Sequence, residues 1–161
     1  MALKKIKYAK IIFTMPNADH ESKSIFNEMS NFVKKNKNSM VFKSIGSLAY
    51  LSCLKSVDVI LGNSSSGLLE APTLKVPTIN VGNRQKGRLK AKSVIDCRPK
   101  QKEIFSILTK LLNGKRKNTL KSFKNPYGEG GASNKIAAIL EKTNYNKLLK
   151  KSFISLNKNY R

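Results

Sequence analysis

The chain has 161 residues, 40% of them apolar, and a formal net charge of +23 at neutral pH. This length predicts one domain with a substantial core, and no stretch approaches the ~20 apolar residues of a membrane span. Two cysteines without metal-ligand spacing, in a chain without a recognisable secretory signal, indicate reduced thiols in a cytoplasmic protein.

Predicted strands and helices alternate along the chain, which favours an α/β fold with a mostly parallel sheet and right-handed crossovers. The expected strands cover residues 10–14, 40–42, 57–61, 76–81 and 93–96, and the expected helices cover 21–35, 48–55, 101–112 and 132–149. A further helix, capped by Asn63 or a following serine, is short or kinked, because Pro72 falls near its middle. We expect one domain over residues 1–150 and a basic polar tail over residues 151–161.

The run from Val57 to Arg88 is the most informative part of the sequence. It predicts a buried strand, a turn of small polar residues, a helix, a second strand and a basic turn. A helix N-terminus flanked by glycine and serine is suited to bind phosphate. Glu70, one turn into the helix, could accept hydrogen bonds from a ribose diol, and Arg84 could reach the same crevice. Similar turns also occur where nothing binds, so this pattern alone leaves a purely structural role open.

Residues 62–88, GNSSSGLLEAPTLKVPTINVGNRQKGR, resemble the signature of hydrolysing UDP-N-acetylglucosamine 2-epimerases of sialic acid and related nonulosonate pathways. Other pieces of the chain fit the same family in the same order. Phe13–Asp19 resembles the family's strand and PNAD turn, Ser44–Ser47 its short loop before a helix, and Asn125–Gly130 its NPYGDG motif. The resemblance covers roughly residues 10–143.

The resemblance implies a Rossmann-like three-layer sandwich that corresponds to the C-terminal lobe of a glycosyltransferase-B-type fold. That lobe mainly holds UDP or a UDP-amino sugar. By matching position, the residues implied to bind UDP are Ser64 and Ser65 at the diphosphate, Glu70 at the ribose, Ile45 at the uracil, and Arg84 and Asn17 along the nucleotide pocket. The implied reaction eliminates UDP across C1–C2 and then adds water, which gives UDP and N-acetylmannosamine. No metal or other cofactor is implied.

Family members are more than twice as long, and the carboxylates that carry out their acid–base chemistry belong to the N-terminal lobe. The single histidine, His20, does not occupy the family's histidine motif, so the catalytic residues stay unknown. Two hypotheses follow. The chain is an epimerase lobe completed by a separately encoded or missing N-terminal lobe, or it is a non-catalytic UDP-binding remnant of a truncated gene. The sequence leaves open whether the chain forms a homo-oligomer.

The high charge raises a third alternative, a basic nucleic-acid-binding protein. Residues 84–124 hold fourteen Lys or Arg against two acidic residues, Asp96 and Glu103. Lysine outnumbers arginine 27 to 5, however, and no aromatic cluster accompanies these lysines. Dedicated readers of nucleic acid combine arginine with aromatic platforms, so the composition argues against this role. Part of the cluster would balance the charge of a diphosphate.

Overall fold

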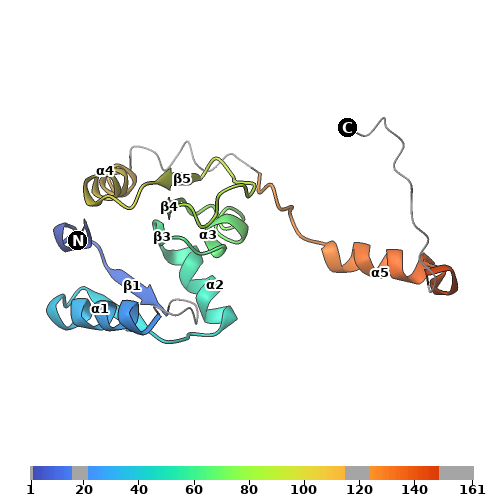
Figure 1. The fold of residues 1–161 in the computed structure, drawn as a ribbon, viewed down its shortest axis with the longest axis horizontal. Helices are drawn as coiled ribbons and strands as arrows, with labels where there is room; N and C mark the ends of the chain where they lie inside the picture. Colours follow the sequence, from blue (N-terminus) through green and yellow to red (C-terminus); the bar gives the residue numbers. More distant parts are fainter. Residues whose placement is uncertain (1, 16–21, 115–123, 149–161) are drawn as a thin grey trace. The chain divides into compact units, whose positions relative to one another are not determined.

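The computed structural model describes residues 2–15, 22–114 and 124–148 (Figure 1). The chain divides into two compact units, Met1–Gly128 and Glu129–Arg161. The predicted tail, residues 151–161, lies outside the described residues.

Helices and strands alternate along the first unit, as the sequence predicts. Its elements are the 3₁₀ helix η1 (Ala2–Lys5), β1 (Ile11–Thr14), α1 (Ser22–Lys35), β2 (Ser39–Phe42), α2 (Ser47–Ser56), β3 (Ile60–Gly62), α3 (Ser66–Leu69), β4 (Thr78–Val81), β5 (Val94–Cys97) and α4 (Gln101–Leu112). The second unit contains α5 (Ala132–Lys142) and the 3₁₀ helix η2 (Tyr145–Leu148).

The assigned strands pair in parallel throughout, in agreement with the predicted fold class. β1 pairs with β2, and β4 pairs with β3 on one side and β5 on the other. The assigned strands form two sheets, of two and three strands, where the sequence pattern suggests one. β3 is also shorter than the predicted strand 57–61, since its ladder with β4 begins at Ile60.

The sheet β3–β4–β5 lies between two helical layers. Thr78 and Ile79 are neighbours on β4, so their side chains point to opposite faces of the sheet. The Thr78 hydroxyl donates to the carbonyl of Gly67 on α3, whereas Ile79 packs in a cluster with Leu108 and Leu111 of α4. The α3 and α4 helices therefore cover opposite faces of this sheet (Figure 1). This arrangement of helix, sheet and helix confirms the expected three-layer sandwich.

A cluster of core residues lies on the α4 side of the sheet. Five buried residues form this cluster: Ile6, Ile79, Cys97, Leu108 and Leu111. The α4 helix spans the predicted residues 101–112, because its apolar residues recur at helical spacing and face this cluster. The core thereby fixes the ends of β4 and β5, from which the candidate site is built.

The last predicted helix, 132–149, is too long. The α5 helix ends at Lys142, where Thr143 adopts an extended backbone and its hydroxyl donates to the carbonyl of Ile139 at 2.6 Å. The Tyr145 hydroxyl donates to the carbonyl of Leu140 at 2.7 Å. Side chains that satisfy the last helical carbonyls compete with the continuation of the helix, and the pattern of apolar residues does not reveal this competition.

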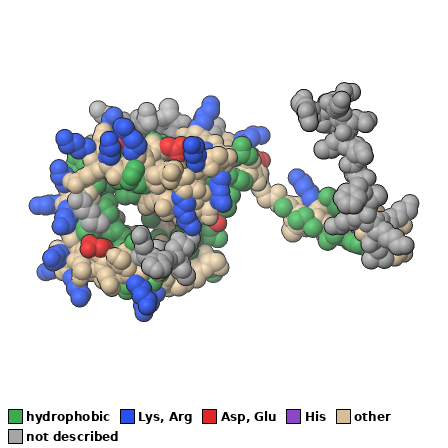
Figure 2. Space-filling model, in the orientation of Figure 1, with side chains coloured by type: hydrophobic (Ala, Val, Ile, Leu, Met, Phe, Trp, Pro, Cys, Tyr) green, Lys and Arg blue, Asp and Glu red, His purple; other side chains and the backbone are tan. Residues whose placement is uncertain are grey.

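Basic side chains are scattered over the visible face of the unit Met1–Gly128 and do not gather in one patch (Figure 2). Within residues 2–15, 22–114 and 124–148, no helix is both long enough and apolar enough to cross a bilayer.

Candidate functional site

The predicted site residues Ser64, Ser65 and Arg84 follow the carboxyl ends of two paired strands. Gly62, at the end of β3, is in register with Asn80 on β4. The loops that leave these parallel strands therefore start at the same edge of the sheet, which is where α/β proteins place their ligands. We call residues 63–66 the serine turn and residues 82–90 the basic loop.

Gln85 joins the basic loop to the serine turn. Its side-chain amide donates to the carbonyl of Asn63 at 2.7 Å, and the residue is only 3% exposed. The oxygen of the same side-chain amide, Oε1, is buried and has no hydrogen-bond partner among the described residues. The sequence does not mark Gln85 as part of the site, because its position next to Arg84 does not reveal that it is buried.

The helix that follows the serine turn is a single turn of four residues, Ser66–Leu69. The amides of Leu68 and Leu69 donate to the carbonyl of Ser65 at 2.9 Å, and a run of turns then continues as far as Lys75. Pro72 lacks an N–H, so regular helix cannot continue through it. A helix this short has little macrodipole, so hydroxyl groups and nearby cations matter more for an anion here than the sequence suggests.

Glu70 comes directly after α3 and is half-buried. Its Oε2 atom is buried and has no hydrogen-bond partner in the described part of the chain. The close approach of α3 to β4 sets the position of this carboxylate. A Cβ placed on Gly67 would lie 2.6 Å from the Thr78 methyl group, so only glycine fits there.

Ile45 lies at the approach to α2, where Gly46 has a positive φ of 71°. Tyr50, near the start of α2, shares a 2.6 Å hydrogen bond with the hydroxyl of Ser66, the first residue of α3. This bond ties the start of α2 to the serine turn. The sixth predicted residue, Asn17, lies outside the described residues.

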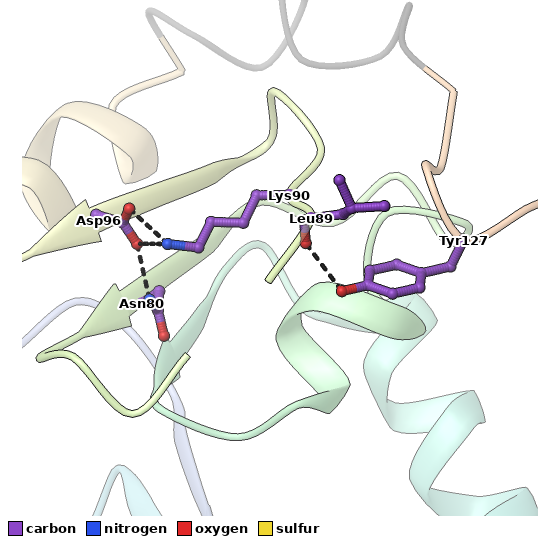
Figure 3. A network of polar contacts seen from close by, with 5 residues as sticks. All are labelled: Asn80, Leu89, Lys90, Asp96 and Tyr127. Carbon is purple, nitrogen blue, oxygen red and sulfur yellow. Dashed lines mark hydrogen bonds and ion pairs between the residues drawn. The ribbon is translucent and has the colours of Figure 1, made fainter. Parts of the chain in front are cut away.

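The carboxyl end of the basic loop is fixed to the sheet (Figure 3). Lys90 Nζ lies 2.8 and 2.7 Å from the two carboxylate oxygens of Asp96 on β5. The amide of Asn80 on β4 donates to the same carboxylate at 2.7 Å. The hydrogen bonds from Lys90, and to a smaller extent the one from Asn80, hold the pKa of Asp96 below its ordinary value. Asp96 is therefore ionised at neutral pH and serves as an anchor.

Residues 124–128 contact both parts of the site. Asn125 donates from its amide to the carbonyl of Leu69 at 2.7 Å and to the hydroxyl of Thr73 at 2.8 Å. Tyr127 donates from its hydroxyl to the carbonyl of Leu89 in the basic loop at 3.0 Å, as Figure 3 shows.

A hollow of about 520 Å³ lies between the basic loop and the end of β5. Lys86 and Lys90 line it together with Cys97, Arg98 and Glu103. Hydrogen bonds from the backbone and the guanidinium of Arg98 lower the pKa of Glu103, while burial raises the pKa of the Cys97 thiol. The hollow thus holds paired charges and a protonated thiol. Within the described residues, no cluster of His, Cys, Asp or Glu has the makings of a metal site.

The family described as UDP-N-acetylglucosamine 2-epimerase matches residues 1–141. The chain belongs to this family. This confirms the resemblance that the signature, the PNAD turn and the NPYGDG-like motif indicated.

Individual proteins with names of the same kind are also similar to this chain. The hydrolysing GDP/UDP-N,N'-diacetylbacillosamine 2-epimerase of Campylobacter jejuni is 44% identical over 92 residues, which cover 56% of this chain and 24% of that protein. The polysialic acid biosynthesis protein P7 of Escherichia coli is 40% identical over 116 residues, which cover 72% of this chain and 29% of that protein. The UDP-GlcNAc 2-epimerase of Methanocaldococcus jannaschii, solved with UDP-GlcNAc and UDP, superposes with a TM-score of 0.66 at 25% identity and covers 88% of this chain.

The match covers 38% of the Methanocaldococcus protein. The chain therefore spans well under half the length of each of these three relatives.

Proposed function

We propose that this chain is the UDP-binding part of a hydrolysing UDP-N-acetylglucosamine 2-epimerase. Ser64 and Ser65 bind the diphosphate, Glu70 binds the ribose hydroxyls, Ile45 meets the uracil, and Arg84 and Asn17 line the nucleotide pocket. Family membership supports this assignment, as does the common sheet edge that carries the serine turn and the basic loop.

The observation that carries the proposal is the carboxylate of Glu70. Its buried Oε2 has no hydrogen-bond partner among the described residues, and buried polar atoms in proteins are nearly always paired. A carboxylate accepts hydrogen bonds and donates none, so its partner must be a donor, and a hydroxyl group is one such donor. The diol of a ribose supplies two such donors beside the serine turn, where the diphosphate would lie.

The complete reaction needs a base positioned at C2 of the sugar. Asp96 and Glu103, the carboxyl groups with lowered pKa values, are bonded to Lys90 and Arg98 respectively. Both stay ionised at neutral pH and are held in ion pairs, which suits anchors better than a free general base or a general acid. We therefore propose that the acid–base groups come from an N-terminal lobe, and that the completed enzyme releases UDP and N-acetylmannosamine.

The pathway and the compartment belong to the same proposal. The names of the Campylobacter and Escherichia relatives favour a role in making sialic acids or related diacetamido sugars. The free thiols of Cys53 and Cys97 fit a reducing compartment such as the cytoplasm.

Calorimetry with UDP tests the site. We expect Glu70→Gln to weaken UDP binding about ten- to a hundredfold, since hydrogen bonds to a charged group contribute ~1.5–3 kcal/mol. Glu141→Gln on α5 is the matched control and should bind UDP as the wild type does. A wild-type chain without affinity for UDP at millimolar concentration would refute the proposal.

A turnover assay tests whether this chain is catalytic by itself or only binds UDP. Release of UDP and N-acetylmannosamine from UDP-N-acetylglucosamine by this chain alone would show that it is catalytic without another lobe. UDP binding without turnover favours a lobe that requires completion, or a non-catalytic UDP-binding remnant.

A further inference from the structure

One short segment after α4 bonds to both halves of the candidate site. Asn125 binds the carbonyl of Leu69 and the hydroxyl of Thr73, which lie on either side of Glu70. The Asn125 side-chain oxygen accepts a hydrogen bond from the backbone amide of Tyr127 at 3.0 Å. The Tyr127 hydroxyl in turn donates to the carbonyl of Leu89. The backbone beside Glu70 and the basic loop are thus joined through two residues.

The remaining bonds of the basic loop have different targets. Gln85 bonds to Asn63 in the serine turn, and Lys90 bonds to Asp96 on β5. These bonds fix the loop to the sheet edge. Tyr127 bonds to Leu89 of this loop (Figure 3). Through Asn125, the same segment also bonds to Leu69 and Thr73, on either side of Glu70 in the sequence.

The spacing of a nucleotide's own groups gives this link a use. Ribose and diphosphate are covalently joined at a fixed distance, so the carboxylate and the cations that bind them must keep a matching separation. Misplacement by about 1 Å is enough to weaken a preorganised site strongly. The exposed Arg84 and Arg88 lie on the basic loop, and Tyr127 bonds to Leu89 near the end of this loop.

We propose that Asn125 and Tyr127 are positioning residues that hold the basic loop and the end of α3 in register for one nucleoside diphosphate. This inference rests on the proposed function, because the two residues are proposed to hold in place the groups of the same UDP site. Neither residue contacts the ligand. Tyr127 acts on the diphosphate through the basic loop, and Asn125 acts on the ribose through the backbone beside Glu70.

Tyr127→Phe removes the hydroxyl and keeps the ring. We expect affinity for UDP to fall about two- to tenfold, the effect of one net hydrogen bond, while affinity for uridine stays unchanged because uridine carries no phosphate. Amide hydrogen exchange over residues 82–90 should quicken in the same variant. Asn125→Ala should weaken UDP and uridine alike.

Tyr145→Phe is the matched control. It removes a tyrosine hydroxyl that also donates to a backbone carbonyl, that of Leu140, in the unit Glu129–Arg161. This variant should bind UDP and uridine as the wild type does, with unchanged exchange over residues 82–90.

The outcomes separate the two proposals. A wild-type chain that fails to bind UDP overturns the proposed function, and the positioning role with it. If the wild type binds UDP and Tyr127→Phe behaves like Tyr145→Phe, the positioning role alone is overturned. Equal losses of UDP and uridine affinity in Tyr127→Phe would also overturn it, because they would indicate general loosening of the fold. Unchanged uridine binding in Asn125→Ala would overturn the role of Asn125.

Discussion

Gly67→Ala should destabilise the protein by driving α3 away from the sheet. The added Cβ would lie 2.6 Å from the Thr78 methyl carbon and 3.3 Å from its hydroxyl oxygen. Carbon atoms in contact lie about 3.5–4.0 Å apart, so a shift of roughly 1 Å is needed. Thr78 is 2% exposed and cannot turn away without losing its 2.9 Å hydrogen bond to Gly67. We expect the free energy of unfolding, measured by urea titration, to fall by about 1–3 kcal/mol.

Two further variants make the Gly67→Ala test specific. Gly62→Ala is the control, because its Cβ would meet nothing within 4 Å; its stability should stay within about 1 kcal/mol of the wild type. Adding Thr78→Ser to Gly67→Ala removes the clashing methyl group and keeps the hydroxyl, so part of the loss should be recovered. Equal stability of the two alanine variants, or no recovery with serine, would refute the steric reasoning.

Three other changes have defined expectations. Arg84→Ala should weaken UDP binding about tenfold in calorimetry, because it removes a positive charge from the proposed pocket of an anionic nucleotide. Asp96→Asn should lower stability at neutral pH, and this difference should shrink in acid. Because Lys90 and Asn80 hold the pKa of Asp96 below 3.8, its contribution is full above that value and is lost as pH falls through the lowered pKa. Leu108→Ala, at a core position 4% exposed, should reduce the free energy of unfolding by about 2–5 kcal/mol.

Each of these changes has its own check. Lys110→Ala removes a positive charge from exposed α4 surface, and equal loss of UDP affinity there would mean that net charge, and not the site, attracts the ligand. A difference between Asp96→Asn and wild type that persists unchanged below the lowered pKa would contradict the ion-pair account. Leu48→Ala, at a position 80% exposed, should leave the urea midpoint nearly unchanged, in contrast to Leu108→Ala.

The candidate site could be read partly from the sequence, because Ser64, Ser65, Glu70 and Arg84 have chemical groups suited to a nucleotide. Their recurrence in a family signature added the substrate class. The residues that support the site, such as Gln85, could not be recognised from the sequence. Gln85 is uncharged and acts through a bond to a backbone carbonyl that depends on how two loops meet.

The sequence by itself determined the alternation of strands and helices, the parallel pairing and the family, because apolar periodicity and short motifs are local properties of the chain. Only the tertiary structure showed that α3 is a single turn pressed against Thr78, that α5 stops at Lys142, and that residues 125–127 join both sides of the site. The first and last of these features depend on contacts between residues 11 to 56 positions apart, which no local pattern specifies. The end of α5 depends on side chains that bond four and five residues back, and the apolar pattern does not show these bonds.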